Sequence, residues 1–155
     1  MKIKNIDYIV FDVGGVLVEL IGADILLQWT GSRFRNEAEL YEAWICSPAV
    51  QQFERGHCSV EKFVSAIIEE LGLPVTENEF LDEFVSWPNG LLEGAADMLH
   101  ELKVHNPVAC LSNTNEVHWM NQKDTGYLNK IFDRMFLSYR MGMVKPDLEI
   151  YHAMI

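Results

Sequence analysis

The sequence predicts an α/β fold, a parallel sheet with a small helical cap inserted after its first strand. The apolar segment 6–13 indicates a strand near the N-terminus, whereas residues 20–87 carry helical patterns only. After this block, short apolar segments alternate with helical patterns, which is typical of parallel strands joined by helices. We therefore place the core at residues 1–17 and 89–155 and the cap at residues 18–88.

The composition fits one soluble domain with an insertion. The chain has 155 residues and 12 basic against 23 acidic side chains, so its formal net charge is −11. Because no basic cluster occurs, we expect no nucleic-acid or anionic-membrane partner. Three cysteines without CxxC spacing suggest reduced thiols in the cytoplasm. The N-terminal apolar stretch is no membrane span or secretory signal, because four acids interrupt it, Asp7, Asp12, Glu19 and Asp24.

The cap pattern includes two helices with clear start signals. Ser59 is a candidate N-cap for a helix whose apolar positions recur at helical spacing up to Leu71. Thr76 and Glu79 form a capping box for a second helix that reaches about residue 86. The sequence "WPNG" at residues 87–90 predicts a turn and marks the end of the cap.

The core pattern then alternates between the two kinds of element. We expect helix over residues 93–104, helical or irregular structure over residues 115–131, and a last helix from about Asp147. The strands between them are expected at residues 107–111 and 135–138. The sheet is thus predicted to be open and Rossmann-like, with ligands bound outside the carboxyl ends of its strands.

Polar residues stand where each predicted strand ends. Asp12 follows the first strand, Ser112 and Asn113 end the second, and Lys145 lies in the loop beyond the third. In-line phosphoryl transfer to a carboxylate needs such a nucleophile, with hydroxyl, amide and ammonium groups around the phosphorus. After Asp12, a glycine loop that includes Gly15 lets backbone N–H groups approach a phosphoryl group. Each signal alone is also typical of a turn or a helix cap, but together and in this order they favour phosphoryl transfer.

Four segments resemble the haloacid dehalogenase-like hydrolase superfamily. They are "FDVGGVL", "LSNTN" and "GMVKPDLEIY", which match the first three motifs of the family, and "FERGHCSVEKF" in the cap. The likeness covers essentially the whole chain. It is strongest toward the sugar-phosphate phosphatases, such as glucose-1-phosphate phosphatase, and toward the phosphatase domain of soluble epoxide hydrolases.

This resemblance implies a role for each residue at the strand ends. Asp12 is the nucleophile, Ser112 and Asn113 hold the phosphoryl group, and Lys145 steadies both nucleophile and phosphate. The magnesium ion of the family is bound by Asp12 and the backbone carbonyl of Gly14, and the cap closes over the substrate. The expected substrate is a small phosphorylated metabolite, and the protein is expected to be a monomer or homodimer.

The chain departs from the family pattern in two places. Gly14 stands where most of these phosphatases have a second aspartate that acts as general acid and base, so the proton must come from water, the cap or the substrate. This favours substrates with good leaving groups, such as a sugar 1-phosphate. The acidic fourth motif, which completes the magnesium site, is absent before Ile155, and we therefore expect the core to be incomplete at its C-terminus.

The leading interpretation is a magnesium-dependent phosphatase of small organic phosphates. Two alternatives stay open, a metal-independent 2-haloacid dehalogenase that uses Asp12, and a non-catalytic phosphate-binding module that lacks the last acidic motif. Three tryptophans of the predicted cap could line a sugar site, although packing in the core is the simpler role for Trp29, Trp44 and Trp87.

Overall fold

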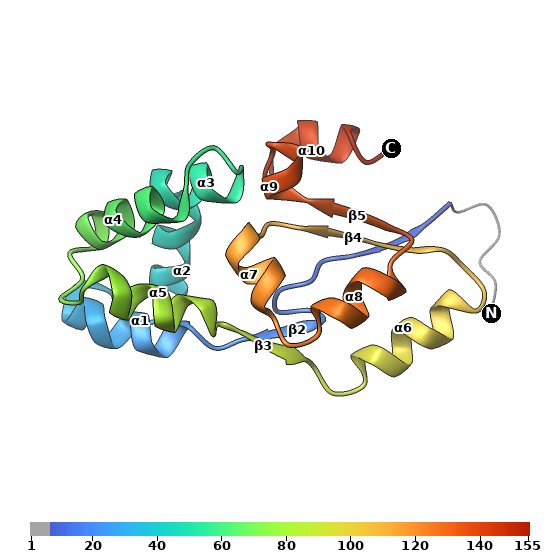
Figure 1. The fold of residues 1–155 in the computed structure, drawn as a ribbon, viewed down its shortest axis with the longest axis horizontal. Helices are drawn as coiled ribbons and strands as arrows, with labels where there is room; N and C mark the ends of the chain where they lie inside the picture. The colour runs from blue at the N-terminus through green and yellow to red at the C-terminus, as the bar shows by residue number, and fades with distance from the viewer. Residues whose placement is uncertain (1–6) are drawn as a thin grey trace.

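The computed structural model describes residues 7–155, in which a three-stranded sheet with its helices adjoins a group of cap helices (Figure 1). The three strands are parallel and lie in the order β1–β4–β5. The fold class predicted from the sequence, a parallel α/β core with a helical insertion after its first strand, is confirmed. The strands of this sheet are β1 (Ile9–Phe11), β4 (Val108–Ser112) and β5 (Arg134–Leu137).

The first strand is shorter than the predicted segment 6–13, of which residue 6 lies outside the described residues. Asp12 and Val13 lie beyond its end, because the Val13 carbonyl accepts the backbone N–H groups of Leu17 and Val18 and so begins a turn. The central strand β4 is buried along its whole length, since it has a strand on each side.

Five short helices connect and flank the strands of the core. The segment 115–131, expected to be helical or irregular, forms α7 and α8, and the predicted last helix begins one residue after Asp147. Their apolar side chains form a cluster with the sheet around Leu99, Trp119 and Leu128. The helices are α6 (Ala95–Lys103), α7 (Glu116–Asn121), α8 (Thr125–Ile131), α9 (Ser138–Met141) and α10 (Leu148–His152).

The cap is built from five α-helices and one 3₁₀ turn. Both start signals are confirmed, because the Ser59 hydroxyl accepts the N–H of Lys62 and Thr76 forms a capping box with Glu79. The elements are α1 (Ala23–Thr30), η1 (Gly31–Arg33), α2 (Glu37–Cys46), α3 (Pro48–Glu54), α4 (Val60–Leu71) and α5 (Glu77–Val85).

Aromatic side chains hold the cap together as a cluster separate from that of the core. The rings of Phe53 and Phe63 stack with their centroids 4.3 Å apart, and Phe84 lies 5.1 Å from Phe63. Such aromatic contacts contribute about 0.5–1.5 kcal/mol each beyond the area that they bury. The cap thus has its own hydrophobic core, which extends from Leu26 to Trp87.

Two short strands join the cap to the core. These are β2 (Val18–Leu20) and β3 (Pro88–Leu91), and they pair antiparallel with each other, apart from the main sheet. The prediction that "WPNG" forms a turn is therefore wrong, since three of its residues begin β3. Pro88 is tolerated as the first residue of an edge strand, and Gly90 takes a φ of 107° within it.

Among the described residues, no helix is both long and apolar enough to cross a membrane.

Candidate active site

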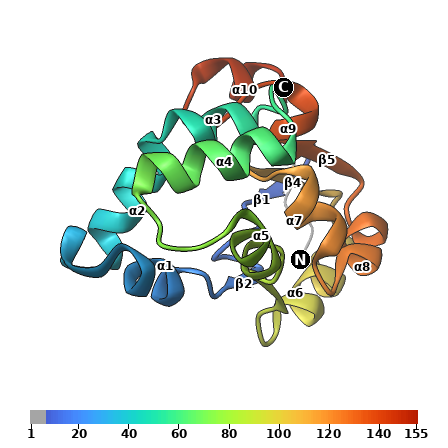
Figure 2. The same ribbon diagram turned by 60° about the vertical axis from the view of Figure 1, so that its left-hand side comes forward.

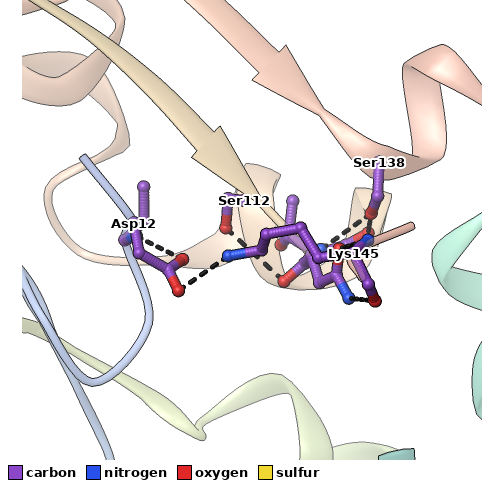
Figure 3. Close-up of polar contacts among 7 residues, drawn as sticks. Asp12, Ser112, Ser138 and Lys145 are labelled. Atoms are coloured by element: carbon purple, nitrogen blue, oxygen red, sulfur yellow. Dashed lines mark hydrogen bonds and ion pairs between the residues drawn. The ribbon is translucent and has the colours of Figure 1, made fainter. Parts of the chain in front are cut away.

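The carboxyl ends of the three core strands face the cap, and polar side chains meet there (Figures 1 and 3). The Lys145 Nζ lies 2.7 Å from the Asp12 Oδ2, although the two residues are 133 positions apart in the chain (145 − 12). Ser112, the last residue of β4, lies beside this ion pair (Figure 3), and the next residue, Asn113, bonds the backbone of Lys145. The structure thus brings together the nucleophile, the cation and the polar pair that the sequence predicts at the strand ends.

The Asp12 carboxylate is held at both of its oxygens. Its Oδ1 accepts the backbone N–H of Val13 at 2.8 Å, and its Oδ2 faces the Lys145 ammonium. The side chain of Asp12 is 45% exposed, against 20% for Lys145. The negative charge of Asp12, at the end of an apolar strand, is therefore not buried in the core. It borders an open cavity and lies next to the positive charge of Lys145.

Asn113 positions the main chain of Lys145. Its side-chain amide donates to the Lys145 carbonyl at 3.0 Å, and its Oδ1 accepts the Lys145 N–H at 2.7 Å. These two bonds fix the loop that carries the ammonium group. The predicted contact of Asn113 with a phosphoryl group stays a prediction, and the amide side chain is already engaged with this loop.

Two serines mark the ends of neighbouring strands. The Ser112 hydroxyl lines the cavity described below and makes one long hydrogen bond, 3.4 Å, to the Asn113 carbonyl. Ser138, which follows β5, accepts the Thr114 N–H at 2.9 Å and donates to the Thr114 carbonyl at 2.7 Å. Ser138 is not among the site residues predicted from the sequence, although it stands at the end of a strand as Ser112 does. It braces the loop after β4 and is fully buried.

The two glycines after Asp12 have different surroundings. Gly14 lines the cavity, whereas Gly15 is not among the lining residues and its N–H donates to the Val18 carbonyl at 2.8 Å. Gly15 has a φ of 71°, a left-handed conformation that glycine adopts without steric cost. In this structure Gly15 therefore forms the turn, and its predicted contact with substrate is untested.

A cavity of about 710 Å³ extends from the ion pair into the cap. At one end it is lined by Asp12, Ser112 and Lys145, and at the other by apolar side chains of the cap helices. Trp44 and Trp87 line it and pack against each other, with ring centroids 5.2 Å apart, whereas Trp29 is not in the lining and packs against Phe80. The apolar lining includes Leu26, Leu40, Trp44, Phe53, Phe84 and Trp87.

One further acidic residue, from the cap, lines this cavity and was not predicted from the sequence. Glu54, the last residue of α3, lines the cavity together with Asp12 and Lys145. Burial raises the pKa of the Glu54 carboxyl to about 7, and the Lys145 ammonium opposes this rise. The only signal in the sequence is its place within "FERGHCSVEKF", the cap segment that resembles the family.

The oxygen donors at the strand end are of the kind that magnesium prefers. Asp12 offers a carboxylate and Gly14 a backbone carbonyl, and Mg²⁺ commonly takes one or two carboxylates together with water and substrate phosphate. No group of three or more metal-ligating side chains occurs within residues 7–155. The acid nearest in the sequence to Lys145, Asp147, is paired with Arg55 at 2.6 Å. Asp12 and Gly14 therefore fit part of a magnesium site.

Comparisons with known proteins point to phosphatases. No family model matches the chain. A D-ribitol-5-phosphate phosphatase of Bacteroides thetaiotaomicron is 26% identical over 99% of this chain and 76% of its own length. A sesquiterpene phosphatase of Aspergillus oryzae is 28% identical over 94% of this chain and 71% of its own length.

The solved structures agree with the sequence relatives. A haloacid dehalogenase-family enzyme of Bacteroides thetaiotaomicron, in complex with magnesium and inorganic phosphate, superposes with a TM-score of 0.72 at 28% identity, over 97% of this chain and 77% of that one. An L-2-haloacid dehalogenase superposes with a TM-score of 0.61 at 22% identity, over 97% of this chain and 70% of that one. This second likeness concerns the fold alone.

Proposed function

We propose that the chain, which resembles the haloacid dehalogenase-like hydrolases in sequence and in fold, hydrolyses small phosphate monoesters through an aspartyl phosphate at Asp12. The observation that carries the proposal is the ion pair of Asp12 with Lys145, 2.7 Å long and open to a cavity. A carboxylate that is partly exposed to a cavity can attack the phosphorus of a bound ester. The adjacent cation offsets the charge of the arriving phosphate.

The residues around the phosphate act by position and charge. The Asp12 Oδ2 attacks phosphorus in line with the leaving oxygen, while the Lys145 ammonium bonds the non-bridging oxygens in place of the carboxylate. Ser112 donates its hydroxyl to the same phosphoryl group, since its present hydrogen bond is long and weak. Asn113 holds the Lys145 backbone, so the ammonium stays in place as the charge moves.

Magnesium is the proposed cofactor, and the Asp12 carboxylate and the Gly14 carbonyl are the groups of this chain that would hold it. A bound magnesium ion would act as a Lewis acid and offset the negative charge of the phosphoryl group. Three structures of the Bacteroides thetaiotaomicron enzyme contain magnesium, which supports this proposal.

The substrate is proposed to be the phosphate ester of an alcohol that has an apolar surface. The sequence favours a sugar 1-phosphate because Gly14 supplies no proton, whereas the far end of the cavity is lined by Leu26, Phe53 and Trp87. An apolar alcohol removes its surface from water against such walls, a gain of about 25 cal/mol per Å². The Aspergillus oryzae relative, a sesquiterpene phosphatase, supports this second substrate class.

A release assay separates the candidate reactions. The protein is incubated with glucose 1-phosphate, ribitol 5-phosphate, farnesyl phosphate and 2-chloropropionate, each with magnesium and with EDTA, and free phosphate and chloride are measured. The proposal expects magnesium-dependent phosphate release that the Asp12→Asn variant loses. Chloride release in EDTA indicates the dehalogenase, and phosphate binding by calorimetry without any release indicates the non-catalytic module.

A further inference from the structure

Among the described residues that line the cavity, Gly14 offers no side chain to protonate the leaving group, whereas the cap residue Glu54 carries a carboxyl. Given the proposed phosphatase function, we propose that the Glu54 carboxyl donates a proton to the leaving oxygen and later recovers one from the attacking water. This assigns a catalytic role to a cap residue, and it replaces the acid that is missing at Gly14.

Glu54 has the right position for this role. It is the last residue of α3 and lines the same cavity as Asp12 and Lys145. Figure 2 shows α3 above the end of the sheet, beside α9 and α10 of the core. Gly14, two residues after the nucleophile, also lines the cavity but carries no side chain. Glu54 therefore borders the same cavity as Asp12, and it is near enough to Lys145 for the ammonium charge to act on its carboxyl.

Two contacts hold the end of α3 on the core. Arg55, the next residue, pairs with Asp147 at 2.6 Å, which joins the cap to the loop that carries Lys145. Gly56 then passes so close to the Tyr139 carbonyl in α9 that any side chain at this position collides with it. Glu54 is thereby fixed relative to Lys145 by the two residues that follow it, Arg55 and Gly56.

The carboxyl itself is free to exchange a proton. Among the described residues it has no hydrogen-bond or ion-pair partner, and the nearby charge that acts on it is Lys145. Because burial raises the pKa of Glu54 to about 7, both its acid and its base form are populated near neutral pH, as a proton shuttle requires. The charged side chains that share the cavity with it are Asp12, Glu37, Arg55, Lys145 and Asp147.

Other titratable groups of the cavity are less suited. Asp147 is committed to Arg55. His118 is held by its Nε2 on the Phe84 carbonyl at 2.8 Å, and burial lowers its pKa to about 4, so it carries no spare proton near pH 7. Glu37, in the first turn of α2, is the remaining carboxylate and provides a control within the cavity.

The two half-reactions balance with Glu54 alone as the proton carrier. In the first, the bond from the Asp12 Oδ2 to phosphorus forms while the ester P–O bond breaks. The electron pair of that bond goes to the leaving oxygen, which takes the Glu54 proton and departs as the neutral alcohol. In the second, water attacks phosphorus and gives its proton to the Glu54 carboxylate, the bond from Asp12 to phosphorus breaks, and inorganic phosphate leaves.

The test compares two leaving groups in matched variants. 4-Nitrophenolate leaves without a proton at neutral pH, whereas the alkoxide of hexyl phosphate needs one. Because general acid catalysis contributes ~10²–10⁴-fold, we expect Glu54→Gln to lower kcat/KM for hexyl phosphate at least ~30-fold more than for 4-nitrophenyl phosphate. Glu54→Asp should recover part of this difference, while Glu37→Gln and the exposed cap variant Glu69→Gln should leave the ratio of the two rates as in the wild type.

Each result decides between named alternatives. Equal losses on both esters in Glu54→Gln overturn the role of Glu54 and leave the phosphatase in place, since such losses indicate a structural defect. A selective loss in Glu37→Gln moves the role to that residue and also overturns the assignment. Hydrolysis of neither ester by the wild-type protein overturns the proposed function, and the role of Glu54 with it.

Discussion

At the scale of single residues, the site depends on how two charges are held 2.7 Å apart. Asp12 follows a three-residue strand, and Lys145 reaches it from a loop. The Asn113 side chain hydrogen-bonds both the backbone N–H and the carbonyl of Lys145 and so holds this loop in place. Charge-assisted pairs of this kind are shorter and stronger than neutral hydrogen bonds. The ion pair is partly open to the cavity, so an arriving phosphate can take the place of the Asp12 carboxylate on the Lys145 ammonium.

The Lys145 ammonium should therefore matter for both binding and turnover. Lys145→Ala leaves Asp12 and phosphate facing each other without a cation. A hydrogen bond to a charged group contributes about 1.5–3 kcal/mol, so phosphate affinity should fall ~10–150-fold, together with kcat. Calorimetry with inorganic phosphate and steady-state kinetics measure the two. Lys130→Ala, on the surface of the same domain, is the matched control, and normal phosphate affinity in Lys145→Ala contradicts the assigned role.

At the scale of elements, the cap touches the core at two sites besides the β2–β3 link. One is the end of α3 against α9, and the other joins α5 to α7, where the His118 ring lies 4.0 Å from that of Phe84 and bonds its carbonyl. Both are contacts between elements far apart in the chain. Local signals predicted the capped starts of α4 and α5, but these contacts depend on packing that no local pattern encodes.

The His118 contact should make stability depend on pH. Burial lowers the pKa of His118 from 6.5 to about 4, so between these values the unfolded chain binds more protons than the folded one. The free energy of unfolding should then fall as pH drops from about 6.5 to 4, by on the order of 2–3 kcal/mol. Urea unfolding across this range compares the wild type with His118→Gln, which keeps an amide donor. A wild-type slope no steeper than that of the variant refutes this linkage.

Gly56 should matter for activity more than an ordinary turn glycine does. Gly56 and Gly72 have similar left-handed φ values, 68° and 63°, but a side chain at 56 meets the Tyr139 carbonyl whereas one at 72 meets nothing within 4 Å. Alanine at either position costs about 1–2 kcal/mol of backbone strain. Only Gly56→Ala should also displace the end of α3 and lower kcat/KM.

Thermal unfolding and kinetics of both glycine variants measure these two effects separately. If Gly72→Ala lowers kcat/KM as much as Gly56→Ala, the contact with Tyr139 has no special part in the site.

At the scale of the whole molecule, the order of elements and the meeting of Asp12 with Lys145 were predictable from the sequence. The contacts that connect the cap to the core were not. Parallel strands bring their carboxyl ends together, so the meeting of Asp12 and Lys145 could be predicted from their places after the strands. The pairing of Val18–Leu20 with Pro88–Leu91 was missed, since two short strands 67 residues apart (88 − 20 − 1) lack a local signal and one begins with turn residues. The position of Glu54 in the cavity of Asp12 and Lys145 likewise depends on how the cap packs on the core, for which the sequence has no local signal.

The whole molecule should also use magnesium in a substrate-dependent manner. One carboxylate and one carbonyl are few ligands for magnesium, so Asp12 and Gly14 should bind the ion weakly by themselves and more tightly when phosphate adds its oxygens. Isothermal titration should therefore show magnesium binding that tightens when inorganic phosphate is present and weakens in Asp12→Asn. Equal affinity with and without phosphate contradicts a shared site.

The most direct test of the central claim is to trap phosphate on Asp12. The protein is mixed with excess 4-nitrophenyl phosphate and magnesium, quenched in acid within the first turnover, and digested for peptide mass spectrometry. The account predicts a phosphorylated peptide that contains Asp12 as its modified residue, together with a burst of 4-nitrophenol, and neither in Asp12→Asn. Steady turnover without a burst or a modified Asp12, or undiminished turnover by Asp12→Asn, contradicts it.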